Sequence, residues 1–283
     1  MPMGRHFRSV RSEVKHMELT ARYGLEFNPF LKNSKEIIYI SAEWKEVHFR
    51  LDYLLKTKGF GLLTGSPGGG KTTNVRHWTR ELNPSLYKVI YTSLSTVTVN
   101  DFYRNLAYAL GAQPAYRKTE NFHSIQEEIN RLALEKRKTP VIVIDEANYI
   151  SNAILNDLKI LFNFEMDSKD RAVVLLVGLP QINHTLSLAI HEPMRQRIIM
   201  NYNIDPYTKE EGREYISAKL RGAGCTQPVF EDGAIEAVLN AADGIARMIN
   251  KLCNAALVIG NSQSQNLITA DTVMQAINES TLG

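Results

Sequence analysis

Cysteine is scarce in this chain of 283 residues, which contains only Cys225 and Cys253. Their wide separation matches neither the short ligand spacing of a metal site nor the dense pattern of a disulfide-stabilised domain. His184 and His191 likewise have no second histidine or carboxylate at ligand spacing, so we expect no transition-metal site. We interpret both cysteines as buried or incidental thiols of a protein in the reducing cytoplasm.

Long apolar runs are also missing. The longest buried-looking stretches, Val141–Ile144 and Ala172–Val177, have the length of strands. They fall far short of the roughly 18 residues that a membrane-spanning helix needs. Residues 1–16 carry charge without a following apolar region, so a secretory signal is not expected. The sequence therefore predicts a cytoplasmic protein that has no membrane partner.

An excess of one charge sign occurs only near the N-terminus. The net charge of the chain is +3, and the basic leader at residues 1–25 accounts for all of it. Such an arm could bind the phosphate backbone of a nucleic acid. A solvated leader that binds nothing explains the same residues, so both interpretations stay open.

Strand and helix patterns alternate through residues 26–205. Short apolar runs predict five strands, near residues 59–64, 88–93, 141–144, 172–177 and 201–204. Uniformly apolar strands that alternate with helices are typical of a parallel sheet covered on both faces. After residue 206 only helical patterns follow. We therefore predict an α/β fold, with a five-stranded αβα core at 26–205 and an all-helical lid at 206–283.

A glycine-rich loop follows the first predicted strand and opens a helix. It reads Gly65, Ser66, Pro67, Gly68, Gly69, Gly70, Lys71 and Thr72, with Thr73 next in the helix. This is the phosphate-binding pattern G-x-x-x-x-G-K-[ST] in the context that supports it. Glycines let backbone N–H groups surround phosphates, and the helix N-terminus adds partial positive charge. We expect Lys71 to bind the β- and γ-phosphates of ATP and Thr72 to bind Mg²⁺.

The third predicted strand ends in two acidic residues, Asp145 and Glu146. A parallel strand presents such residues at its carboxyl end, where ligands bind in open α/β sheets. We expect Asp145 to hold Mg²⁺, directly or through water. Glu146 is the candidate catalytic base that polarises the attacking water in ATP hydrolysis.

The pairing of GSPGGGKT with VIVIDEA, followed by a helical domain, resembles the AAA+ P-loop ATPases. Three segments resemble the ExeA-like group in particular: FNPF at 27–30, VLLVGLP at 174–180 and GIARMINKLCNAAL at 244–257. That group includes a secretion-system component. It also includes ATPases of mobile elements similar to the TnsC, MuB and IstB transposition regulators.

The resemblance implies roles for three arginines. Arg247 takes the sensor-2 position, where a guanidinium contacts the γ-phosphate. Arg195 and Arg197 lie where AAA+ proteins carry arginine fingers, and Arg197 is the preferred candidate. Because a finger acts on a neighbour's nucleotide, the resemblance implies a homo-oligomer, either a ring or a helical filament.

One position departs from the AAA+ pattern. The sensor-1 position normally holds a polar residue at a strand end, but the segment here is Gly178, Leu179 and Pro180. Gln181 or Asn183 could supply the missing polar group from the next turn. The departure bears on the rate of hydrolysis more than on nucleotide binding.

The leading hypothesis is an ATP-dependent regulator of a transposase that binds double-stranded DNA through its phosphates. Basic residues at 118, 131 and 136–138 could face DNA, or form a solvated helix face. A secretion-associated ATPase of the ExeA type and a slow nucleotide switch with a protein partner are the alternatives.

Overall fold

A computed structural model describes residues 18–93 and 97–281 and divides them into two compact units. Unit 2 consists of Tyr39–Thr208 and Ile245–Arg247. Unit 1 consists of the segment up to Ile38, Lys209–Gly244 and the segment from Met248 onward. The basic arm at residues 1–17 lies outside the described residues.

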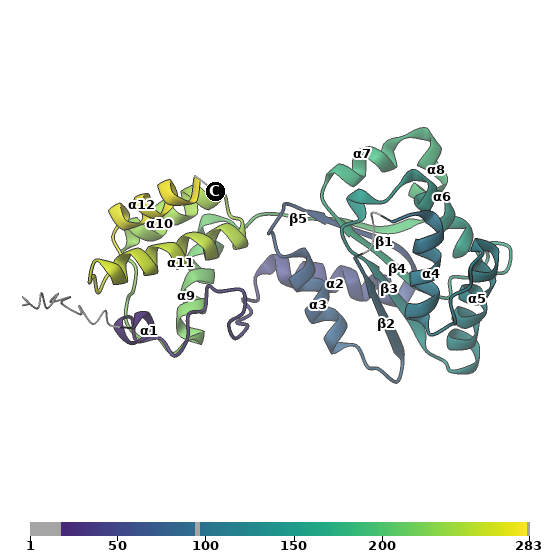
Figure 1. The fold of residues 1–283 in the computed structure, drawn as a ribbon, viewed down its shortest axis with the longest axis horizontal. Coiled ribbons are helices and arrows are strands. Elements are labelled where there is room, and N and C mark those ends of the chain that lie inside the picture. Colours follow the sequence, from purple (N-terminus) through teal and green to yellow (C-terminus); the bar gives the residue numbers. More distant parts are fainter. Residues whose placement is uncertain (1–17, 94–96, 282–283) are drawn as a thin grey trace, which may run out of the picture. The chain divides into compact units, whose positions relative to one another are not determined.

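Unit 2 contains a five-stranded, wholly parallel sheet, which confirms the predicted core (Figure 1). The strand order is β2-β3-β4-β1-β5, so β2 and β5 are the edge strands. The strands are β1 (Gly59–Gly65), β2 (Tyr87–Thr92), β3 (Thr139–Ile144), β4 (Val173–Gly178) and β5 (Ile198–Ile204). All the carboxyl ends therefore meet at one end of the sheet, where the phosphate loop, Asp145 and Glu146 lie, whereas Arg195 and Arg197 precede β5 at its amino end.

Helices cover both faces of this sheet (Figure 1). One core layer joins α2 (Ala42–Thr57) and α3 (Lys71–Glu81) to the strands. The opposite layer joins α4 (Val99–Leu110), α5 (Lys118–Asn130) and α6 (Asn152–Leu161) to the strands. A short π-helical turn, η1 (Arg131–Glu135), continues α5. Three central strands are buried on both faces, which explains their uniformly apolar sequences.

Short helical segments lie in the connections from β3 to β4 and from β4 to β5. They are η2 (Ala147–Tyr149), α7 (Gln181–Ser187), η3 (Ala189–His191) and α8 (Glu192–Arg195).

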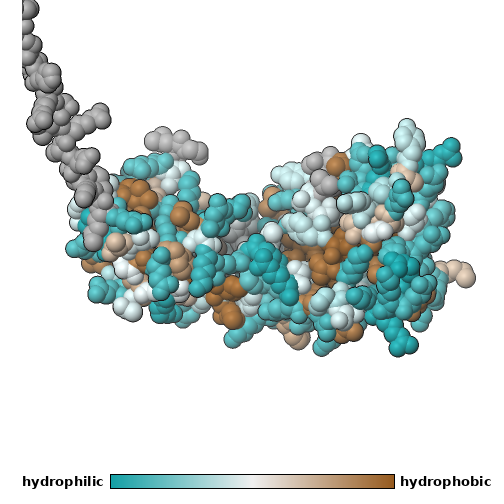
Figure 2. All heavy atoms as spheres, turned by 60° about the horizontal axis from the view of Figure 1, so that its bottom comes forward, coloured by the Kyte–Doolittle hydropathy of each residue, from teal (hydrophilic) through white to brown (hydrophobic). Residues whose placement is uncertain are grey.

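Hydrophilic side chains cover much of the face drawn in Figure 2, with smaller hydrophobic groups among them. On the edge strand β2, Val89 and Tyr91 are 38% and 53% exposed.

Unit 1 is helical. Its helices are α1 (Leu19–Arg22), α9 (Lys209–Gly222), α10 (Asp232–Ala242), α11 (Ala246–Ser262) and α12 (Ala270–Thr281). The first two residues of α11 are grouped with unit 2. In the described parts of the chain, no helix is both long enough and apolar enough to cross a bilayer.

The N-terminal segment packs into unit 1, whereas the sequence analysis assigned residues 26–38 to the core. The buried ring of Phe30 meets the ring of Phe230 edge-on, with 6.4 Å between centroids. The side chains of Asn28 and Asn254 are joined by a 2.8 Å hydrogen bond. The aromatic segment is therefore part of the packed interior of unit 1.

Candidate nucleotide-binding site

The phosphate loop connects β1 to α3, as the motif predicts. Gly68 and Gly70 have φ values of +80° and +96°, a region that favours glycine. Asn74, in the first turn and a half of α3, donates from its side chain to the carbonyl of Gly70 at 3.1 Å. The N-terminal N–H groups of α3 have no partner within the helix, so the loop offers donors for an anion.

Lys71 lies within this loop and is 9% exposed. Its ammonium donates to the carbonyls of Gly65 at 2.7 Å and Ser66 at 3.0 Å. Burial lowers the pKa of Lys71, and the nearby carboxylates of Glu146 and Asp145 oppose that shift. A phosphate bound in the loop would add negative charge and favour the protonated ammonium.

The Asp145 carboxylate receives donors from three parts of unit 2. Its Oδ2 accepts from the Thr72 hydroxyl at 3.0 Å and from the Tyr91 hydroxyl at 2.7 Å. Its Oδ1 accepts from the backbone N–H of Glu146 at 2.9 Å. Burial and the hydrogen bond to this carboxylate raise the pKa of Tyr91, so the phenol stays protonated. Sequence reasoning did not find Tyr91, because nothing in the local pattern of β2 marks it.

These oxygen donors fit Mg²⁺. A hydroxyl and a buried carboxylate 3.0 Å apart are hard ligands, and Mg²⁺ in nucleotide sites takes one or two carboxylates together with phosphate oxygens. Among the described residues no group of three or more histidine, cysteine or acidic side chains could hold a metal by itself. Thr72 and Asp145 are therefore the residues that would hold the cation.

Glu146 follows Asp145 with its carboxylate exposed to solvent. Its backbone is left-handed, with φ of 53° and ψ of 37°, which is uncommon for a residue with a side chain. Strained backbone of this kind occurs often at functional sites. The short helix η2 begins directly after it, so the turn holds Glu146 at the carboxyl end of β3.

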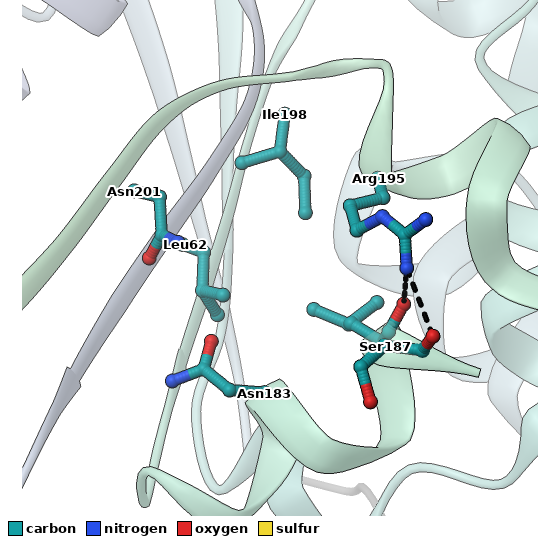
Figure 3. Close-up of a pocket in the computed structure, with 7 residues that line it drawn as sticks. Leu62, Asn183, Ser187, Arg195, Ile198 and Asn201 are labelled. Carbon is teal, nitrogen blue, oxygen red and sulfur yellow. Dashed lines mark hydrogen bonds between the residues drawn. The ribbon is translucent and has the colours of Figure 1, made fainter.

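The side chain of Asn148, a residue of η2, lies beside the end of β4, where the strand itself carries no polar residue. Its Oδ1 accepts from the backbone N–H of Leu179 at 2.9 Å. A Cβ on Gly178 would lie 3.0 Å from the backbone nitrogen and the Oδ1 of Asn148. Of the two residues that the sequence offered for this position, Asn183 lines the pocket drawn in Figure 3 and Gln181 is exposed at the start of α7. Asn148 follows Asp145 by three residues in the sequence, but only the folded chain brings it to Gly178.

Arg247 is grouped with unit 2 and lies at the phosphate loop. Its backbone N–H donates to the carbonyl of Gly68 at 3.2 Å. A Cβ on Gly68 would lie 2.6 Å from the Cβ of Arg247, so glycine at this position permits the close approach. Thr73 is half-buried in the first turn of α3.

The two candidate arginine fingers bind different carbonyls of their own chain. Arg195 donates to the carbonyls of Leu186 and Ser187 at 3.1 and 3.0 Å, shown as dashed lines in Figure 3. Arg197 donates to the carbonyl of Lys159 at 2.9 Å and pairs with Asp167 at 2.5 Å. The pocket in Figure 3 is lined by Leu62, Asn183, Leu186, Ser187, Arg195, Ile198 and Asn201.

Three residues of the basic set considered as a DNA surface have partners within unit 2. Lys118 pairs with Asp157 at 2.6 Å, and Arg131 pairs with Glu128 at 2.5 Å. Lys138 donates to the carbonyl of Pro84 at 2.8 Å. These contacts favour the solvated-face interpretation for part of the set.

Part of the chain matches a known protein family, and the chain has relatives among known proteins. Residues 54–186 match the family described as an AAA domain. The chain is 29% identical over 267 residues to the general secretion pathway protein A of Aeromonas hydrophila. That match covers 92% of this chain but only 48% of the relative, so the chain spans about half of its length. An uncharacterized HTH-type transcriptional regulator of Methanocaldococcus jannaschii is 23% identical over 302 residues, covering 90% of this chain and 72% of that protein.

Solved structures share the fold at low sequence identity. Cdc6p of Pyrobaculum aerophilum has a TM-score of 0.67 at 15% identity, covering 89% of this chain and 70% of its own. The ORC1 protein of Aeropyrum pernix in complex with DNA has a TM-score of 0.65 at 19% identity, and the match covers 89% of this chain and 68% of ORC1. The RuvB branch migration motor of Thermotoga maritima has a TM-score of 0.57 at 20% identity, and the match covers 83% of this chain and 67% of RuvB.

The parallel sheet with its phosphate loop and the AAA-domain match over residues 54–186 agree with the resemblance of the sequence to AAA+ P-loop proteins. Within that class, the similarity to the secretion protein supports an ExeA-like relationship.

Proposed function

We propose that the chain binds ATP with Mg²⁺ and hydrolyses it to ADP and phosphate. The observation that carries this proposal is the 3.0 Å hydrogen bond between Thr72 and Asp145. It joins the first turn of the phosphate-loop helix to the carboxyl end of β3, beside Glu146. The nucleotide phosphates and the attacking water would then share one edge of the sheet.

Each residue of the candidate site has its own role in the proposed reaction. Lys71 and the N–H groups of α3 hold the phosphates, and Thr72 and Asp145 hold the cation. A Mg²⁺ ion held by these two residues would offset the negative charge of the phosphate oxygens. Glu146 orients a water and takes its proton as the oxygen bonds to the γ-phosphorus. The bond from that phosphorus to the ADP oxygen breaks.

Arg247 and one of the finger candidates complete the proposed machinery. Arg247 would contact the γ-phosphate from its place at Gly68. Arg197 or Arg195 would act on the nucleotide of a neighbouring copy in a ring or filament. Since both arginines bind their own chain in the single copy, assembly would have to exchange those contacts for the neighbour's phosphate.

We further propose that the chain is a cytoplasmic, ATP-dependent regulator of a transposase. In this role the chain itself binds double-stranded DNA. The fold is shared with ORC1 in a structure that contains DNA. The excess positive charge of residues 1–25 would attract phosphates. Affinity for DNA should then fall steeply with salt and depend little on base sequence.

A secretion-associated ATPase is the second candidate, and the 29% identity to general secretion pathway protein A favours it. A third candidate is a nucleotide switch that hydrolyses ATP slowly and acts on a protein partner. The unusual sensor-1 position favours it. In both cases DNA would change neither turnover nor assembly.

One experiment separates these candidates. ATP turnover is measured with and without double-stranded DNA, at low and moderate salt, for the wild type and Lys71→Ala. Lys56→Ala, an exposed lysine of α2, is the matched control. DNA-stimulated turnover that fades with salt supports the DNA regulator. Turnover that DNA does not change supports one of the two candidates that act on a protein partner. If the wild type does not hydrolyse ATP, the proposed ATPase activity is wrong.

A further inference from the structure

One oxygen of the Asp145 carboxylate serves two side chains at once. Oδ2 accepts from Thr72 on α3 and from Tyr91 on β2, while Oδ1 accepts from the backbone N–H of Glu146. Asp145 is 4% exposed, so this buried charge depends on its donors. The three bonds together fix the rotation of the carboxylate at the proposed cation site.

The position of Tyr91 is set by strand pairing. In the parallel register of β2 and β3, Tyr91 lies beside Val143 and Thr92 beside Ile144. The backbone N–H of Asp145 then donates to the carbonyl of Thr92 at 2.8 Å, which continues the pairing by one residue. The end of β2 is therefore held against Asp145, and the phenol hydroxyl reaches the carboxylate at 2.7 Å.

Packing alone does not account for this hydroxyl. Tyr91 is 53% exposed on an edge strand, where its ring contributes little to the interior. The oxygen end of the side chain makes the specific contact, a hydrogen bond to a charged acceptor. Bonds of that kind are stronger than bonds between neutral groups.

We propose that Tyr91 is a positioning residue of the Mg²⁺ site, an inference that rests on the proposed function. Its hydroxyl holds Asp145 so that Oδ2 faces the Thr72 hydroxyl before the cation arrives. Loss of a hydrogen-bond partner behind a metal ligand costs about 10- to 100-fold in metal affinity in other proteins. Because Thr72 and Glu146 still hold Asp145, we expect the lower end of that range.

The test compares Tyr91→Phe with Tyr87→Phe. Tyr87 lies four residues earlier on the same face of β2, so each change removes one hydroxyl from the same surface. Binding of a fluorescent ATP analogue is titrated with Mg²⁺ and repeated in EDTA. We expect Tyr91→Phe to raise the half-saturating Mg²⁺ concentration about 10-fold and to leave affinity in EDTA within twofold. Tyr87→Phe should match the wild type.

The outcomes separate the inference from the function on which it rests. A Tyr91→Phe protein with unchanged Mg²⁺ dependence overturns the inference, and so does tighter Mg²⁺ binding, which would show that the hydroxyl competes with the cation. If Tyr91→Phe loses as much nucleotide affinity in EDTA as in Mg²⁺, the hydroxyl has a general structural role. That result also overturns the inference. If Mg²⁺ does not affect nucleotide binding by the wild type, the proposed function fails first.

Discussion

At the scale of single residues, Gly178 and Asn148 fix the turn that carries Glu146. The Asn148 side chain fills the space beside Gly178 and accepts the N–H of Leu179. AAA+ proteins normally carry a polar residue at this strand end, and here the polar side chain beside it comes from η2. We infer that the geometry of Glu146 depends on the missing side chain at position 178.

Gly178→Ala should therefore lower both stability and turnover. The new Cβ would lie 3.0 Å from backbone and side-chain atoms of Asn148, and forcing an extra carbon into a packed site costs about 1–3 kcal/mol. Urea denaturation measures the stability, and phosphate release at saturating ATP measures the turnover.

Gly233→Ala is the matched control, because its Cβ would have only an ordinary 3.9 Å contact with Ala270. It should keep wild-type turnover. A Gly178→Ala protein as stable and as active as the wild type would show that the turn does not depend on this contact.

At the scale of elements, α5 and η1 are joined by an ion pair that makes stability depend on pH. The hydrogen bond from Arg131 lowers the pKa of Glu128 below its ordinary value of 4.5, against the opposing effect of burial. A carboxyl group whose pKa is depressed by folding adds stability above its unfolded pKa. That contribution is lost as the pH falls through the folded value.

Glu128→Gln should be less stable than the wild type at pH 7, and the difference should shrink as the pH falls below 4.5. Thermal unfolding from pH 3 to pH 7 measures this. Glu127→Gln, one residue earlier in the same helix, is the control. A constant difference across the range would show that the ion pair does not cause the pH dependence.

The strands of the core were predictable to within one to three residues, because central parallel strands are uniformly apolar and end at glycine, proline or acidic residues. The place of the N-terminal segment was not. Arg22 binds Asn261 and Phe30 packs on Phe230, and such long-range contacts leave no local pattern. Tyr91 was missed for the same reason, since only strand pairing brings it to Asp145.

At the scale of the whole molecule, the proposed finger implies that one copy completes the site of another. Arg197→Ala should lower turnover by about 10³-fold or more with little effect on ATP affinity, as expected for an arginine that acts in the transition state. Mixing Arg197→Ala with Glu146→Gln should restore turnover, because each variant supplies the group that the other lacks.

The same mixing experiment with Arg195→Ala decides between the two candidates. Turnover of the mixtures is measured at constant total protein, with each variant alone as the reference. If neither mixture exceeds its separate components, neither arginine acts in trans.

In the proposed mechanism Glu146 activates the water that attacks ATP, and Lys71, Thr72 and Asp145 hold the nucleotide and its cation. Phosphate release and ATP binding by the wild type and Glu146→Gln, measured together with Mg²⁺, test it most directly. We expect the variant to bind ATP as the wild type does and to release phosphate at least about 100-fold more slowly. Equal rates of release by the two proteins would contradict the account.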